Sequence, residues 1–168
     1  DFIRITESAS LYNDIEKMST LAILENMNKE DQKVALAVEQ CIPAIEKLVD
    51  ATAAKLKLGG RLFYIGAGTS GRLGMVDASE CPPTYGVPDD LVIGIIAGGQ
   101  QAMFHAVENA EDDTTQAWLD LSAYKITDLD VVVGIAASGT TPYEIAGLQA
   151  CQEKGITTGS ICCNLNAP

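Results

Sequence analysis

The sequence predicts an α/β fold, a three-layer sandwich in which helices flank a parallel β-sheet, preceded by an N-terminal helical segment. Four short apolar runs, "RLFYIGAG", "LVIGIIAGG", "DVVVGIAAS" and "ITTGSICCN", alternate with stretches of helical pattern. Their valines and isoleucines are continuous rather than alternating with polar residues, which is typical of strands buried on both faces. Such strands belong to a parallel sheet with helices on each side.

The composition excludes several classes of protein. The 168 residues are 47% hydrophobic and 20% charged, as in ordinary globular proteins. A net charge of −12 argues against nucleic acid or an anionic membrane surface as a partner. No apolar run approaches the ~20 residues of a membrane helix. The five cysteines are odd in number and lack CxxC spacing, so we expect small core residues with reduced thiols, a cytoplasmic location and no zinc site.

The first third of the chain has a helical pattern. From Asn28 to Lys57, apolar residues recur every three or four positions and form one face of an amphipathic helix. Asn28 is the predicted N-cap, and Pro43 is expected to kink the helix or split it in two. We therefore predict a helical segment over residues 1–58 and a second domain over residues 59–168.

Helical patterns also fill the gaps between the apolar runs. They are "SGRLGMVDASE", "QQAMFHAVENAED" followed by "TTQAWLDLSAY", and "TPYEIAGLQACQEKG". The chain stops at Pro168, directly after the fourth strand pattern, where an open α/β sheet could continue. We expect the second domain to be truncated at its C-terminal side.

The first strand is followed by a glycine-rich turn, Gly66-Ala67-Gly68-Thr69-Ser70-Gly71, which has the GxGxxG spacing of a dinucleotide site. Such a site also needs an acidic residue ~20 residues further on, at the tip of the second strand. The second strand ends "IIAGG", and Asp89 and Asp90 precede it. No Gly-Lys-Ser/Thr follows the turn, so it is not a Walker loop. We interpret it as a site for a single phosphate.

A second turn, "AASGTTPYE", repeats this design after the third strand, with Pro142 at the predicted first helical turn. Serine and threonine at helix starts are often only N-caps, and this alternative applies to either turn alone. Two such turns with adjacent glycines favour a ligand, because hydroxyls and helix N–H groups can hold a phosphate without lysine. The predicted substrate-binding residues are Gly68, Thr69, Ser70, Gly71, Ser138, Gly139, Thr140 and Thr141.

The segments "GGRLFYIGAGTSGRLGMVDASECPPTYGV", "HAVENAEDD" and "VVVGIAASGTTPYEIAGL" together resemble the N-acetylmuramic acid 6-phosphate etherases of the sugar isomerase (SIS) superfamily. The resemblance runs from about Ile5 to the last residues, and glucokinase regulatory proteins share much of it. It implies a five-stranded parallel sheet, a homodimer, no metal and no cofactor. It also implies a lyase that removes D-lactate from the muramic sugar phosphate in cell-wall recycling and leaves N-acetylglucosamine 6-phosphate.

The resemblance assigns the catalytic acid to Glu80, in "ASECPP", and a second active-site carboxylate to Glu111, in "AED". Elimination of lactate needs a base at C2 of the open-chain sugar and an acid at the departing oxygen, so one carboxyl must be ionised and one neutral. We predict Glu80 as the acid and Glu111 as the base. Because Pro82-Pro83 should end the helix, Glu80 would lie at a helix C-terminus, which disfavours its charged form.

Other interpretations stay open. Glu80 could be a solvated surface residue, and Glu111 could belong with Asp112 and Asp113 to acids that cap the next helix. His105 is more typical of a packed helical histidine, and Arg72 could reach an anion or point into solvent. The alternative functions are a non-catalytic phosphosugar-binding regulator and an aldose–ketose isomerase. A pair of catalytic carboxylates speaks against the regulator.

Overall fold

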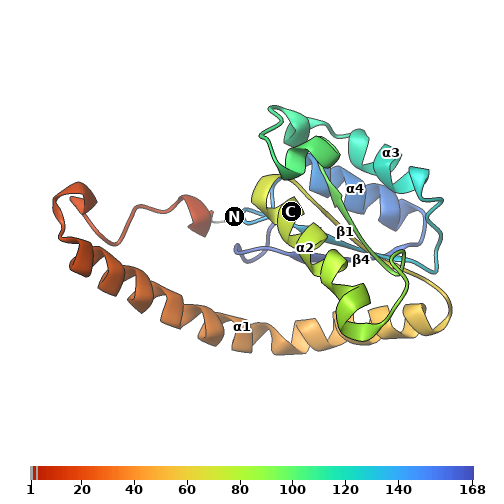
Figure 1. Cartoon of the computed structure of the whole chain (residues 1–168), viewed down its shortest axis with the longest axis horizontal. Coiled ribbons are helices and arrows are strands. Elements are labelled where there is room, and N and C mark those ends of the chain that lie inside the picture. The colour runs from red at the N-terminus through yellow and green to blue at the C-terminus, as the bar shows by residue number, and fades with distance from the viewer. Residues whose placement is uncertain (1, 3) are drawn as a thin grey trace. The chain divides into compact units, whose positions relative to one another are not determined.

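The structure is a computed structural model that describes residue 2 and residues 4–168 (Figure 1). It consists of two compact units, one formed by Asp1–Thr6 with Ala51–Pro168 and the other by Glu7–Asp50. Two short 3-10 helices, η1 (Ile5–Glu7) and η2 (Ile15–Lys17), precede the long helix α1 (Thr20–Lys57).

Helix α1 begins eight residues earlier than predicted, at Thr20 rather than Asn28. Its first turn is capped by Ser19, whose Oγ accepts the N–H of Ala22 at 3.2 Å. Of the two outcomes predicted at Pro43, the split is wrong, because the helix continues through it. A proline removes one backbone hydrogen bond and costs ~3 kcal/mol, which a helix of 38 residues accommodates.

The unit that contains Ala51–Pro168 carries a four-stranded sheet of parallel strands in the order β2-β1-β3-β4. The strands are β1 (Leu62–Gly66), β2 (Val92–Ile96), β3 (Val131–Ile135) and β4 (Thr157–Ile161). All four lie where the apolar runs predicted them, and the predicted α/β class is confirmed. The described chain has one strand fewer than the five that the family resemblance implies.

Helix α2 (Gly68–Tyr85) covers one face of the sheet. The register aligns Tyr64 of β1 with Gly94 of β2, so both point to the same face. Glycines allow α2 to pack closely there: a β carbon on Gly74 would lie 2.7 Å from the Tyr64 Cβ, and one on Gly94 would lie 2.6 Å from the Cα of Met75.

The opposite face is covered by α4 (Pro142–Glu153), with α3 (Gln116–Ala123) packed beside it (Figure 1). A β carbon on Gly147 of α4 would lie 2.8 Å from both Ile65 of β1 and Ala117 of α3. Helices on both faces give the three predicted layers. The core between them is apolar, with Phe63, Ile65, Leu121, Val132, Tyr143 and Cys151 fully buried.

Only one of the five cysteines matches the prediction of small core residues. Cys151 is buried, whereas Cys81 and Cys162 are half-buried and Cys41 and Cys163 are exposed. All five are free thiols.

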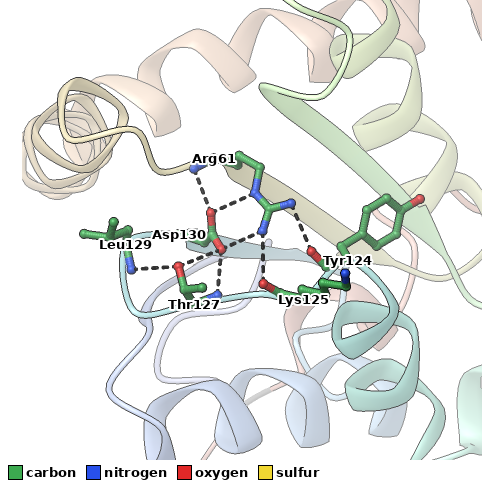
Figure 2. A network of polar contacts seen from close by, with 6 residues as sticks. All are labelled: Arg61, Tyr124, Lys125, Thr127, Leu129 and Asp130. Atoms are coloured by element: carbon green, nitrogen blue, oxygen red, sulfur yellow. Dashed lines mark hydrogen bonds and ion pairs between the residues drawn. The ribbon is translucent and has the colours of Figure 1, made fainter.

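The amino ends of the two central strands are joined by a polar network (Figure 2). Arg61 donates from Nε and Nη2 to the carboxylate of Asp130 at 3.0 and 2.9 Å, and its own N–H adds a third bond at 2.9 Å. Nη1 also reaches the carbonyl of Tyr124 at 3.1 Å, and the N–H of Thr127 reaches Asp130 at 2.7 Å. Burial acts to raise the pKa of Asp130, but the hydrogen bonds from Arg61 and Thr127 outweigh it and the pKa is lowered. This network, here called the Arg61–Asp130 clamp, lies at the amino ends of the strands. A site can therefore form at their carboxyl ends.

Candidate functional site

The site lies where the chain reverses its direction of winding. In the order β2-β1-β3-β4, the chain moves outward from β1 to β2, returns past β1 to β3, and then continues to β4. The loops that leave β1 and β3 therefore lead to helices on opposite faces from the carboxyl ends of neighbouring strands, the place where ligands bind in open α/β sheets. The structure thus brings the two predicted hydroxyl-bearing turns to one edge of the sheet.

The turn after β1 offers a helix N-terminus that is not capped by its own side chains. Ala67 is the N-cap and makes no side-chain cap bond, and Gly68 has a φ of +53°. The N–H of Gly71 is the first to bond within the helix, to Ala67 O at 3.2 Å, so the preceding N–H groups point outward. Neither Thr69 nor Ser70 uses its hydroxyl for a hydrogen bond to any other residue that the structure describes.

Gly71 lets this turn approach the sheet. A β carbon on Gly71 would lie 2.6 Å from the carbonyl oxygen of Gly66 and 2.7 Å from Cγ1 of Ile96. The glycine is therefore required by close contact between α2 and two strands, and it fixes where the outward N–H groups point.

The turn after β3 is organised by Ser138. Its Oγ accepts the N–H of Thr140 at 3.1 Å and the Thr140 hydroxyl at 2.9 Å, while Gly139 takes a φ of +69°. Thr141 is the N-cap of α4 without a side-chain cap bond, and Pro142 is the first helical residue, as predicted. Ser138 Oγ thus shapes the loop by accepting both bonds, and among the described residues the O–H groups of Ser138 and Thr141 remain available as donors.

A cavity of about 210 Å³ adjoins the N-terminus of α2. Its walls are Ala67, Gly68, Arg72, Ala97, Ala102, His105, Ala106, Val107, Glu108, Asn109, Ala110 and Glu111. The structure therefore places the predicted base, Glu111, on the same cavity as Gly68 of the glycine-rich turn. His105 lines this cavity and is exposed, so the interpretation as a packed histidine is wrong.

The helix predicted over 100–112 is absent from the structure. Only the short 3-10 helices η3 (Gln100–Met103) and η4 (Ala110–Asp112) form, because Gly98, Gly99 and Asn109 take positive φ values of +88°, +72° and +61°. Glu108 and Glu111 consequently do not share a helical face, although both line the cavity.

Asp113 has the local role that a capping acid would have. Its Oδ1 accepts the N–H groups of Thr115 and Gln116 at 2.8 and 3.0 Å. These bonds and one from the Thr115 hydroxyl lower the pKa of Asp113.

Arg72, whose role the sequence left open, binds backbone. Its Nε donates to the carbonyl of Met103 at 3.1 Å and its Nη2 to the carbonyl of Ala102 at 2.7 Å. The guanidinium thereby connects the first turns of α2 to η3.

Glu80 does not lie at the end of its helix, so that prediction is wrong. α2 continues through Pro82 and Pro83 to Tyr85, where Gly86, with a φ of +66°, donates its N–H to Pro82 O at 2.8 Å. The two prolines delete only two backbone bonds of the last turns. Glu80 is exposed and follows Gly68 by twelve residues, which at ~1.5 Å per residue is roughly 18 Å along the helix. Within one chain, Glu80 is not part of the cavity wall.

Sequence reasoning missed a buried carboxyl group, that of Glu144. Glu144 is 2% exposed. Among the residues that the structure describes, Oε2 has no hydrogen-bond partner and Oε1 receives only a 3.4 Å bond from the Ser160 hydroxyl. Burial raises the pKa of Glu144 to about 7, against a lowering by Ser160. An acid in the first turn of a helix is common, so Glu144 gave no signal of its own. The sequence feature that bears on its burial is Gly134, a glycine within β3 that leaves room for the Glu144 side chain.

Two further properties bear on the chemistry. The described residues contain no group of three or more histidine, cysteine or acidic side chains arranged to hold a metal ion. Among the same residues, no helix combines the length and the apolarity that crossing a bilayer would require. The cavity offers outward N–H groups, an arginine, a histidine and carboxylates, which suits a small polar anion and proton transfer.

Comparison with known proteins gives a family model and named relatives. Residues 40–152 match the model described as the glucokinase regulatory protein N-terminal SIS domain. The chain is 59% identical over 167 residues to an N-acetylmuramic acid 6-phosphate etherase of Bacteroides fragilis, covering 99% of this chain and 59% of that protein. The etherase of Christiangramia forsetii is also 59% identical, over 163 residues, covering 97% of this chain and 60% of the relative. The chain thus spans about three fifths of the length of these relatives.

Among solved structures, a phosphoheptose isomerase from Francisella tularensis superposes with a TM-score of 0.63 and 21% identity, covering 86% of this chain and 75% of the other. This likeness shows the fold.

Proposed function

Because the chain belongs to the family of the glucokinase regulatory protein N-terminal SIS domain, we propose that its cavity binds a sugar phosphate and that it acts as an N-acetylmuramic acid 6-phosphate etherase. This activity is a carbon–oxygen lyase reaction that yields N-acetylglucosamine 6-phosphate and D-lactate, in cell-wall recycling. The observation that carries the proposal is the shared cavity of Gly68 and Glu111, which joins an anion-binding helix start to a carboxylate. The names of the etherase relatives supply the substrate.

The phosphate binds at the N-terminus of α2, beside the cavity that Gly68 lines. The outward N–H groups of Gly68, Thr69 and Ser70 and the positive end of the α2 dipole attract the dianion. Hydroxyls of Thr69 and Ser70 add donors from the same turn, and those of Ser138 and Thr141 add donors from the turn after β3, where the Thr140 hydroxyl already donates to Ser138. No lysine is needed, which fits a chain with a net charge of −12.

Glu111 acts on the sugar that this phosphate positions. In the open-chain form the aldehyde acidifies the C2 proton, and the Glu111 carboxylate removes it. The resulting enolate expels lactate from C3, and water then adds to the unsaturated aldehyde. A proton must reach the departing ether oxygen, because an alkoxide is a poor leaving group.

Glu80 supplies that proton from a second copy of the chain. It lies roughly 18 Å along α2 from the phosphate turn, too far to meet a sugar held there by the same chain. We therefore propose a homodimer in which Glu80 of one copy completes the site of the other. An exposed apolar stripe on α1, which includes Val38, Ile42, Ile45 and Val49, favours such an assembly. Free cysteines fit the reducing cytoplasm, where we place the reaction.

The experiment is incubation with N-acetylmuramic acid 6-phosphate in heavy water, followed by proton NMR. The etherase mechanism predicts free D-lactate and deuterium at C2 of the product, with no lactate from Glu80→Ala and no C2 exchange in Glu111→Gln. Ketose formation without lactate would instead establish an isomerase. Phosphosugar binding by a folded sample with neither lactate nor exchange would refute the lyase proposal for this chain.

A further inference from the structure

We propose that Arg72 is a positioning residue that fixes the cavity wall carrying Glu111 to the phosphate-binding turn of α2. The inference rests on the proposed function for its catalytic consequence, but its structural part can be tested without activity. Arg72 follows Ser70 by two residues, so the turn that offers N–H groups to the anion also carries the guanidinium. That guanidinium binds the carbonyls of Ala102 and Met103, and it pairs with no carboxylate in the described part of the chain.

The wall that Arg72 reaches is mostly irregular. Between β2 and α3, regular structure is limited to η3 and η4, and their connection runs through exposed residues. The N–H of His105 donates to Gln101 O at 3.0 Å, so His105 follows the position of η3. At the far side, Val107 packs on Gly98, where a β carbon would lie 2.8 Å from its Cβ. At its other end, η4 packs against α4, and Ala110 packs against the core. Arg72 is therefore the polar anchor at the η3 end of the segment, and Val107 and Ala110 are apolar anchors further along it.

The chemistry of arginine suits this task. Its planar fork presents donors in a fixed geometry that can bind two adjacent carbonyl oxygens at once, whereas a lysine ammonium is a flexible point charge. Because carbonyl groups take up Nε and Nη2, the arginine is oriented and its positive charge faces the cavity that it lines. Losing the fork would loosen η3 and His105, and thereby shift the segment that leads from them to Glu108 and Glu111.

The test compares Arg72→Ala and Arg72→Lys with Arg61→Lys as the matched control. Arg61 also donates to backbone carbonyls, those of Tyr124 and Lys125, but at the opposite end of the sheet. Hydrogen exchange of residues 98–113 and the NMR signal of His105, the single histidine of the chain, report on the wall. Titration with inorganic phosphate reports on the turn of α2.

In Arg72→Ala we expect faster exchange over 98–113, a shifted His105 signal and a phosphate affinity within ~3-fold of wild type, because the N–H groups of α2 remain. In the turnover assay we expect kcat to fall at least ~10-fold with KM changed less than ~3-fold, and partial recovery in Arg72→Lys. Arg61→Lys should leave all four readouts unchanged per folded molecule.

Two results would overturn the proposal. Loss of phosphate affinity by more than ~10-fold in both Arg72 variants would make Arg72 an anion ligand rather than a positioning residue. Unchanged exchange and an unchanged His105 signal in Arg72→Ala would show that the wall stands without it. If the wild-type chain releases no lactate, the proposed function fails, while the exchange measurement still decides the role of Arg72.

Discussion

The carboxyl group of Glu144 lies directly over Gly134, and a β carbon on that glycine would stand 2.6 Å from the Glu144 Cγ. Gly134 lies in β3, beside Ser160 of β4 in the register, and Glu144 lies in the first turn of α4. Because Gly134 has no side chain, it leaves the space in which the ionisable side chain of Glu144 is buried. Glu144 lies next to the turn that carries Ser138 to Thr141.

Gly134→Ala should destabilise the fold by ~1–3 kcal/mol, because the new methyl group overlaps the Glu144 side chain in a packed layer. Urea unfolding measures the effect. Glu144→Ala in the same background removes the overlap, so the double variant should lose less stability than the sum of the single variants. Simple additivity would show that the overlap is not the cause.

Glu144 should make the stability depend on pH. Its pKa is raised by burial to about 7 in the folded chain, against 4.5 for an ordinary glutamate. Below about pH 4.5 both states are protonated, so its contribution is fully favourable there. Between pH 4.5 and 7 the unfolded state ionises first, and stability is lost progressively until the loss levels off above pH 7.

Glu144→Gln removes this dependence. We expect the variant to gain up to ~3 kcal/mol relative to wild type at pH 8, and little at pH 4.5. Urea midpoints at several pH values measure the difference, and a difference independent of pH would contradict the prediction.

Gly71→Ala should weaken phosphate binding at least ~10-fold, because its methyl group would collide with the carbonyl of Gly66 and push the first turn of α2 off the sheet. Isothermal titration with inorganic phosphate measures it. Gly86→Ala is the matched control on the same helix: its φ of +66° is strained for alanine, but a β carbon there meets nothing within 4 Å. That variant should lose ~1 kcal/mol of stability and keep its phosphate affinity.

Arg61→Ala should cost ~3 kcal/mol of stability or more, because it leaves the buried Asp130 carboxylate without its cation. Thermal or urea unfolding measures the loss. The clamp lies at the amino ends of β1 and β3, so phosphate affinity of the folded fraction should not change. A loss of affinity without a loss of stability would refute this separation of the two ends of the sheet.

The fold was predictable because its signals are local. Runs such as "DVVVGI" are typical of strands covered on both faces of a sheet, and glycine or proline marks their ends. The loop conformation at the site was not predictable from local signals. The sequence pattern around His105 is helical, but Gly98 and Gly99 with positive φ and a hydrogen bond from Arg72 of α2 favour an irregular conformation. The position of Glu80 was mispredicted for a different reason. Prolines usually end a helix, but α2 accommodates both Pro82 and Pro83. Glu144 needed knowledge of which strand residue faces it.

A subunit-mixing experiment tests whether Glu80 and Glu111 act across a dimer. Glu80→Ala and Glu111→Gln should each be inactive alone. After joint refolding, half of the dimers are mixed, and each has one site with both carboxylates intact, so about a quarter of the wild-type activity should return. If both residues serve a site within one chain, every mixed dimer keeps two damaged sites and no activity returns. Mixing Glu80→Ala with an Arg72→Ala, Glu111→Gln double variant is the control: the intact site then uses only the Arg72 and Glu111 of the first chain, so the same quarter should return.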